Sequence, residues 1–489
     1  MFIGRKAELA SLNRWTQNPR GSQISAVYGR RRIGKTRLVE QAAQAVQAAD
    51  AKQDARLGAG IRFYKFEGLE GEDEASQQAH FVRTLFGYSG NAAHKLFRSD
   101  NWIDHLELLS VFLGEQPAMV LFDEFQWMAA EKTGLVSRLK FAWDNLFIRN
   151  NCAHLVLCGS VSSFMVKKVV NSKALYGRID NIVHLRAMSI GELGDAFMAD
   201  CSDIEKLDYY LCVGGVPKYF ELFDPSKSVR LNLQALCFTR DGYFSDELER
   251  LFVSHFGRSP YFRQVVEGLA LKRFARREEV IAQTSMSPGG SASAVLDELE
   301  LADLIESYGP LHNPGARILK RYRLADHFLR FYFAFIHPLK RELALEPIPL
   351  HSALPDQRYL VWRGLAFEHF CRQNAESIAR ILGFSAVRYT SGVWFGRADM
   401  RTGAQVDLLF SRADSVVTLC EVKYREELGR EVFSQVERKA EAIRNSPLNK
   451  GKNFTIEKVL ISALPVPDAI AEEGYFSGIV TLDKLVRAR

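Results

Sequence analysis

The chain has 489 residues, of which 47% are hydrophobic and 25% charged, an ordinary composition for a soluble globular protein of about three domains. The excess of 64 basic over 58 acidic residues is too small to indicate a nucleic-acid binder by net charge alone. Seven cysteines without a CxxC pair argue against a disulfide framework and a zinc knuckle, and indicate a reducing compartment. The charged N-terminus and the lack of any run of about 18 apolar residues predict a cytoplasmic protein without membrane contact.

Short apolar runs alternate with amphipathic stretches through the first 190 residues. Four of these runs have the length and composition of buried strands, at residues 24–28, 62–66, 118–122 and 154–158. This alternation predicts an α/β fold, a parallel sheet with helices on both faces.

The first of these strands leads into a P-loop of the form GxxxxGK[ST], which opens a helical pattern at Arg37. The glycines let backbone N–H groups face the phosphates, and the helix N-terminus adds positive potential. Lys35 would reach the β and γ phosphates, and Thr36 would offer its hydroxyl to Mg²⁺. We therefore expect the loop to bind a nucleotide through Gly29, Arg30, Arg31, Arg32, Ile33, Gly34, Lys35 and Thr36.

Two acids follow the third strand, and two further polar residues lie beyond the fourth. Asp123 has the position of a Walker B aspartate in the Mg²⁺ shell, and Glu124 that of the acid that polarises the attacking water. Ser160 is a candidate for orienting that water, although serine after glycine is also common in plain loops. Arg178 is a candidate for stabilising charge on the γ-phosphate from its own or a neighbouring subunit, with a surface arginine as the alternative.

The middle of the chain has the plan of a winged helix. Residues 276–283 and 291–301 predict two helices around a Ser/Pro/Gly turn, and residues 304–308 and 317–324 predict a hairpin wing. Basic side chains there would contact DNA phosphates without reading sequence: Lys272, Arg273, Arg276, Arg277, Arg317, Lys320, Arg321 and Arg323. The second helix is itself acidic, so a packing or protein-interaction module is the alternative.

The C-terminal part carries a second pattern of phosphate chemistry. Asp407 lies in one predicted strand, and Glu421 and Lys423 lie on one face of the returning strand, so a hairpin brings them together. Two acids can hold Mg²⁺ or Mn²⁺, and the lysine can place the water that attacks a phosphodiester. This D-x13-ExK pattern resembles the PD-(D/E)XK nucleases, in which the first core helix often adds an acid, here Glu368 on a helix expected at 367–382. Gln435, with Lys439 one turn later, has the position at which related nucleases contact the site.

Several motifs together resemble the archaeal-type ATPases of the AAA+/STAND group: residues 2–9, the P-loop, Asp123 and Glu124, the LYGR ending at Arg178, and GGVPKYF at 214–220. This resemblance covers essentially the whole chain. It implies ATP as the nucleotide, Gly4 and Arg5 near the adenine, and a helical lid. Together with the pattern along the chain, it gives four domains: a P-loop ATPase at 1–190, the lid at 191–249, a winged helix at 250–345, and a nuclease-like domain at 346–489, which begins with a proline-containing linker candidate at 346–355.

Two functions remain open from the sequence. In the first, ATP binding and hydrolysis control DNA engagement and a metal-dependent endonuclease at Glu368, Asp407, Glu421 and Lys423. In the second, a regulatory ATPase binds DNA or a partner while the nuclease-like domain only scaffolds. A weaker third possibility is a signalling or defence ATPase that forms a homo-oligomer through the P-loop domain, with Arg178 acting in trans.

Overall fold

The computed structural model describes residues 2–17, 21–50, 61–90, 97–130, 133–150, 152–160, 162–257, 259–270, 272–309, 311, 320–395, 405–446 and 454–488. The chain forms two compact units, Met1–Met188 and Ser189–Arg489. Of the helices within these ranges, none combines the length and apolar content that crossing a bilayer requires.

The first unit is built on a five-stranded sheet in the order β2-β3-β4-β1-β5, in which every neighbouring pair is parallel. Its strands are β1 (Gln23–Tyr28), β2 (Arg62–Glu67), β3 (Ala118–Asp123), β4 (Ala153–Gly159) and β5 (Ile179–His184). Its helices are α1 (Lys6–Gln17), α2 (Lys35–Asp50), α3 (Glu74–Ser89), α4 (Trp102–Leu113), α5 (Phe125–Met128), α6 (Leu135–Ala142), η3 (Trp143–Phe147), α7 (Ile148–Asn150), α8 (Ser162–Phe164) and η4 (Met165–Val170). This confirms the predicted parallel α/β sheet.

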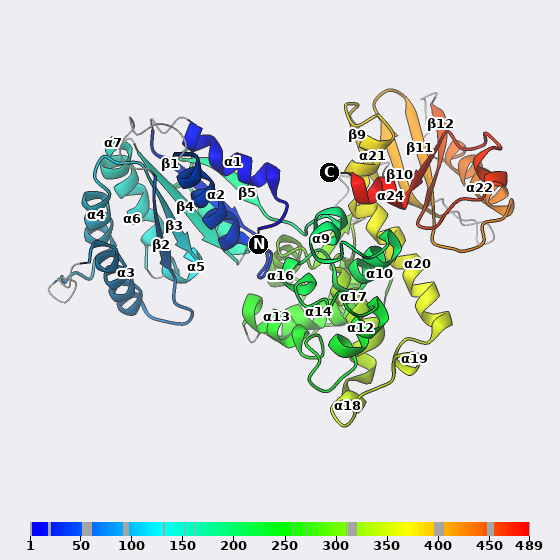
Figure 1. The fold of residues 1–489 in the computed structure, drawn as a ribbon, viewed down its shortest axis with the longest axis horizontal. Coiled ribbons are helices and arrows are strands. Elements are labelled where there is room, and N and C mark those ends of the chain that lie inside the picture. Colours follow the sequence, from blue (N-terminus) through cyan, green and yellow to red (C-terminus); the bar gives the residue numbers. More distant parts are fainter. Residues whose placement is uncertain are drawn as a thin grey trace. The chain divides into compact units, whose positions relative to one another are not determined.

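The core of this unit follows from the two-residue period of its strands. Val120 and Phe122 of β3 point into an apolar cluster with Phe81 of α3, Leu106 of α4 and Leu139 of α6. Figure 1 shows these helices on one side of the sheet, in cyan and dark blue, and α1 and α2 on the other. Because β1 and β3 both pair with β4 in parallel, the loops that follow these two strands lie at the same edge of the sheet, where α/β proteins bind ligands.

The second unit begins with helices and carries a small sheet in the order β6-β8-β7. Its helices before this sheet are α9 (Ile190–Phe197), α10 (Asp203–Val213), α11 (Pro217–Phe220), α12 (Val229–Cys237), α13 (Glu247–Phe256) and α14 (Pro260–Ala270). Then come β6 (Ala275–Arg276), α15 (Arg277–Ile281), α16 (Gly290–Leu301), β7 (Ile305–Tyr308), β8 (Arg321–Leu324), α17 (His327–Phe331), η6 (Tyr332–Ile336), η7 (His337–Leu339), α18 (Lys340–Leu343) and α19 (Leu350–Ala353).

The unit ends in a separate mixed sheet in the order β13-β12-β11-β10-β9, drawn in yellow to red in Figure 1. Strands β9, β10 and β11 are antiparallel neighbours, whereas β11, β12 and β13 are parallel. The elements of this part are α20 (Asp356–Gln373), α21 (Ala375–Ile381), β9 (Tyr389–Phe395), β10 (Gln405–Arg412), β11 (Val416–Lys423), α22 (Glu431–Arg444), β12 (Thr455–Ser462), α23 (Asp468–Ala471), β13 (Gly478–Thr481) and α24 (Leu482–Arg487).

Three sequence-based boundaries differ from the structure. The helix expected at 367–382 is two helices, because α20 begins at Asp356 and the chain breaks at Asn374 before α21. The boundary expected between residues 249 and 250 falls inside α13. The expected linker at 346–355 contains α19 and packs against the unit, since Ile348 is buried and its N–H donates to the Phe238 carbonyl.

Candidate active sites

The P-loop at the end of β1 has a backbone that only glycine tolerates at its first position. Gly29 has φ +153°, and a Cβ on it would lie 2.3 Å from the carbonyl oxygen of Leu185. Arg5 fixes the loop from the other side, because its guanidinium donates to the carbonyl oxygens of Ile33 (3.4 Å) and Arg186 (2.6 Å). Gly4 and Arg5 both have positive φ, which directs this buried arginine toward the loop. The Gly4 and Arg5 pair therefore supports the loop that the sequence assigned to the nucleotide.

The loop contacts Asp123 at the end of β3 through a hydroxyl, while its cationic side chains have other partners. The Thr36 hydroxyl donates to both Asp123 carboxylate oxygens, at 3.1 and 2.9 Å. The Lys35 ammonium donates to the Arg30 carbonyl at 3.0 Å, and burial lowers the pKa of Lys35. Arg31 reaches outward to Glu70, with 2.9 Å between Nη2 and Oε2.

Glu124 is held by two neighbours at the same edge. Its Oε2 accepts from the Ser160 hydroxyl at 2.6 Å and from the Gln126 amide at 2.5 Å. Burial by itself raises the pKa of Glu124, but these hydrogen bonds and the charge of Lys35 outweigh it, so the pKa lies below its usual value. Glu124 is thus an ionised acceptor in a fixed position, with left-handed backbone at φ 48°.

These groups fit a magnesium nucleotide. A loop without a side chain at Gly29 and a helix N-terminus at α2 suit phosphates, while the Thr36 hydroxyl and the Asp123 carboxylate are the oxygen donors that Mg²⁺ prefers. The structure brings together Lys35, Thr36, Asp123, Glu124 and Ser160 as the sequence predicted.

Sequence reasoning missed two residues of this edge. Gln126 donates to Glu124 and, at 3.2 Å, to Ser160. Lys65 of β2 lies 3.2 Å from the Asp123 carboxylate. A signal for Lys65 was present, because this lysine lies between the aromatic residues Tyr64 and Phe66, but the pairing of β2 with β3 could not be predicted from the sequence.

Arg178 lies in a different arrangement from the one expected for a phosphate contact. It forms a bidentate pair with Asp144, at 2.7 and 2.9 Å, and its remaining amino group donates to the carbonyls of Ala174 and Tyr176. The hydrogen bonds from Arg178 lower the pKa of Asp144 to about 2. The guanidinium is therefore already satisfied within its own unit.

We expect Arg178→Ala and Asp144→Asn to change ATP turnover equally, within about twofold, and to cost at most about 1 kcal/mol of stability because the pair is partly exposed. Steady-state turnover and urea denaturation of both variants test this. A tenfold loss of turnover confined to Arg178→Ala would instead assign the arginine to the γ-phosphate.

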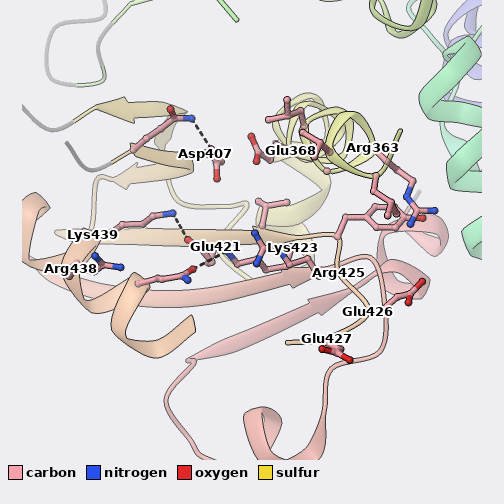
Figure 2. A pocket seen from close by; sticks show the side chains of 18 of the residues that line it. Arg363, Glu368, Asp407, Glu421, Lys423, Arg425, Glu426, Glu427, Arg438 and Lys439 are labelled. Atoms are coloured by element: carbon pink, nitrogen blue, oxygen red, sulfur yellow. Dashed lines mark hydrogen bonds and ion pairs between the residues drawn. The ribbon is translucent and has the colours of Figure 1, made fainter. Parts of the chain in front are cut away.

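The second unit holds a cavity of about 1240 Å³ between α20, the ends of β10 and β11, and α22. Glu368, Asp407, Glu421 and Lys423 all line it, as Figure 2 shows. The register that pairs Leu408 with Cys420 sets Asp407 beside the end of β11, as the hairpin predicted. Gln435 and Lys439 of α22 complete the same wall.

Glu421 lies between two lysines. Its carboxylate is 2.7 Å from the Lys423 ammonium and 2.6 Å from that of Lys439. Lys423 also donates to the Gln435 amide oxygen at 3.2 Å. Glu421 is buried, and these two lysines neutralise its charge.

Glu368 and Asp407 form a second group, in which the two carboxyl groups face each other across the cavity in Figure 2. Burial, and then the charge of Asp407, raise the pKa of Glu368 to about 7. Arg273 and Arg372 lie 3.5 and 3.9 Å from the Glu368 carboxylate and only partly offset this. In the described ranges, no three carboxylate, histidine or cysteine side chains lie close enough together to hold a metal ion, and this includes the expected set of Glu368, Asp407 and Glu421.

The raised pKa of Glu368 predicts a pH-dependent stability. Between pH 4.5 and 7 the folded chain binds more protons at this carboxyl than the unfolded chain, so stability falls as the pH rises through that window. We expect the free energy of unfolding of Glu368→Gln, measured by urea denaturation, to exceed that of wild type by about 3 kcal/mol at pH 8 and by little at pH 4.5. Glu376→Gln, on the exposed side of α21, is the control. An equal difference at both pH values would contradict the shift.

Several of the basic residues expected to contact DNA phosphates, on the wing and in the cluster before it, have partners inside the unit. Arg323 is buried and pairs with Glu306 at 2.6 Å, which corrects its assignment to a phosphate contact. Arg321 stacks over Phe274 and Phe395, with 4.4 and 4.7 Å to the ring centres, and Arg277 donates to the Gly289 carbonyl in the turn before α16. Arg317 lies outside the described residues.

The match to a family model covers the part of the chain that holds the first site. Residues 2–223 match the family model of an ATPase domain predominantly from Archaea. An uncharacterized protein of Methanocaldococcus jannaschii is 22% identical over 439 residues, 88% of this chain and 89% of the relative. A Walker-type ATPase of Pyrococcus abyssi aligns at 18% identity over 68% of this chain and 96% of its own, with a TM-score of 0.47. The ORC2 protein of Aeropyrum pernix aligns at 16% identity over 69% and 94%, with a TM-score of 0.45. Residues 2–223 are thus similar to an ATPase domain found predominantly in Archaea.

Proposed function

We propose that this protein is an ATP-controlled switch whose second unit cleaves DNA with a divalent metal. The observation that carries the nuclease part is the meeting of Glu368, Asp407, Glu421 and Lys423 in one cavity, although they come from one helix and two strands. Carboxylates that can hold a metal ion, together with a lysine that can place a water molecule, are suited to attack on a phosphodiester.

In the ATPase site, Lys35 would bind the β and γ phosphates, and Thr36 and Asp123 would hold Mg²⁺. Glu124, ionised and oriented by Ser160 and Gln126, would polarise the attacking water. Glu124 directly follows Asp123, the proposed Mg²⁺ ligand, and this supports a different role for each acid.

In the cavity of the second unit, Glu368 and Asp407 would hold Mg²⁺ or Mn²⁺, because two facing carboxylates that repel each other gain most from a divalent cation. Lys423 would place the attacking water, and Lys439 would neutralise a phosphate oxygen. Among the described cations beside the small sheet, Lys320 and Arg276 remain available to a DNA backbone.

One observation favours the alternative of a regulatory ATPase with a non-catalytic second unit. Both oxygens of Glu421 are engaged by Lys423 and Lys439, as in a structural ion-pair network. A cleaving enzyme must release Lys423 from this pair, whereas a scaffold keeps it.

The test incubates wild-type protein with supercoiled and linear DNA in Mg²⁺, in Mn²⁺ and in EDTA, each with and without ATP. Metal-dependent cleavage that changes with ATP supports the switch. No cleavage under any condition, in a preparation that hydrolyses ATP, would leave the regulatory ATPase.

A further inference from the structure

Lys65 lies beside Asp123 at the edge of the sheet that holds the nucleotide loop, and the ATPase mechanism above gives it no role. It lies on β2, where its neighbour across the sheet is Leu121 of β3, and its ammonium is 3.2 Å from Asp123 Oδ2. Its backbone is fixed as well, because its N–H and carbonyl both bond to the Tyr88 hydroxyl, at 3.0 and 3.2 Å.

The second partner of Lys65 is Glu40, one turn beyond Thr36 on α2, at 3.5 Å. The ammonium therefore bridges two acids, one of which is the carboxylate that Mg²⁺ requires. A cation placed there compensates the charge of Asp123 as a divalent metal would, and an ammonium and a metal ion at the same carboxylate would repel each other.

We propose that Lys65 is a built-in cation of the nucleotide site, which competes with Mg²⁺ for Asp123 and supports ATP binding when divalent metal is scarce. This proposal rests on the nucleotide site proposed above. Lys65 acts through Asp123 and is therefore a positioning residue. A purely structural role, in which Lys65 only ties α2 to the sheet, predicts altered stability without any change in metal dependence.

The test measures binding of a fluorescent ATP analogue, in EDTA and across a Mg²⁺ titration, for wild type and two variants with opposite predictions. Lys65→Met removes the competitor, so the half-saturating Mg²⁺ falls about tenfold, and affinity in EDTA falls by a similar factor. Glu40→Gln removes the second acid and leaves the ammonium to Asp123, so the half-saturating Mg²⁺ rises about threefold.

Two controls keep the outcome readable. Lys65→Arg retains the charge and should stay near wild type, and Lys140→Met removes an ammonium that pairs with Asp144 away from the nucleotide loop. Unchanged Mg²⁺ dependence in both Lys65→Met and Glu40→Gln, with folded protein, would overturn the role of Lys65 and leave the ATPase intact. No binding of the analogue to wild type would contradict the nucleotide site itself, and this proposal with it.

Discussion

Glu124→Gln is expected to bind ATP as tightly as wild type and to hydrolyse it about 10²- to 10³-fold more slowly. The amide keeps the size of the side chain and can still meet Ser160 and Gln126, so the loop and the Mg²⁺ ligands stay in place. The substitution removes the negative charge that polarises water. Glu124 carries this charge at neutral pH, because its pKa is held below its usual value. Single-turnover hydrolysis and equilibrium ATP binding separate the two effects.

Glu67→Gln is the matched control, since Glu67 ends the neighbouring strand β2 and is exposed. It should leave both quantities within about twofold of wild type. If Glu124→Gln weakened ATP binding and turnover equally, the role of Glu124 would be in holding the nucleotide, and the water would need another base.

The ATPase centre could be predicted because its chemistry is local in the sequence. A P-loop depends on a strand, a glycine turn and a helix that follow one another, and Asp123 follows its own strand directly, so a parallel sheet brings them to one edge. The cavity of the second unit could be predicted in part for the same reason. A hairpin register places Asp407 by Glu421, and only Glu368 comes from a distant element.

Pairings between distant elements could not be predicted. Lys65 reaches Asp123 only because β2 pairs with β3, and Arg178 is engaged only because Asp144 lies on a helical segment packed near it. The arginines of the wing show the same limit, since the buried contact of Arg323 with Glu306 depends on strand pairing. In each case the cation can be seen in the sequence, but which acid pairs with it depends on the fold.

If ATP controls cleavage, it must do so by changing the contacts of Lys423. In the structure this ammonium is held by Glu421 and Gln435, so it is not yet oriented on a substrate. A divalent cation on Glu368 and Asp407 would bring a further positive centre into a cavity that is already lined by several cations, Lys423 and Lys439 among them, and the phosphodiester supplies the negative charge that balances it. Metal and DNA are therefore expected to bind cooperatively, each weakly without the other.

Asp407→Asn tests the metal site with the largest effect expected in the second unit. The change removes one of the two facing carboxylates while its partner Gln405, which donates to Oδ1 at 2.9 Å, can be retained. We expect Mn²⁺-dependent cleavage to fall about 10³-fold and calorimetric Mn²⁺ binding in the presence of DNA to disappear, with ATP turnover unchanged.

Asp414→Asn is the control for this change, because Asp414 lies in the turn between β10 and β11, outside the cavity, and pairs with Arg412. It should cleave like wild type. Because the charge of Asp407 contributes to the raised pKa of Glu368, Asp407→Asn must also return that pKa toward its usual value and reduce the loss of stability between pH 4.5 and 7. A variant that lost cleavage but kept the wild-type pH profile would mean that the two carboxyl groups do not act as one metal site, and the assignment of the metal to Glu368 and Asp407 would then fail.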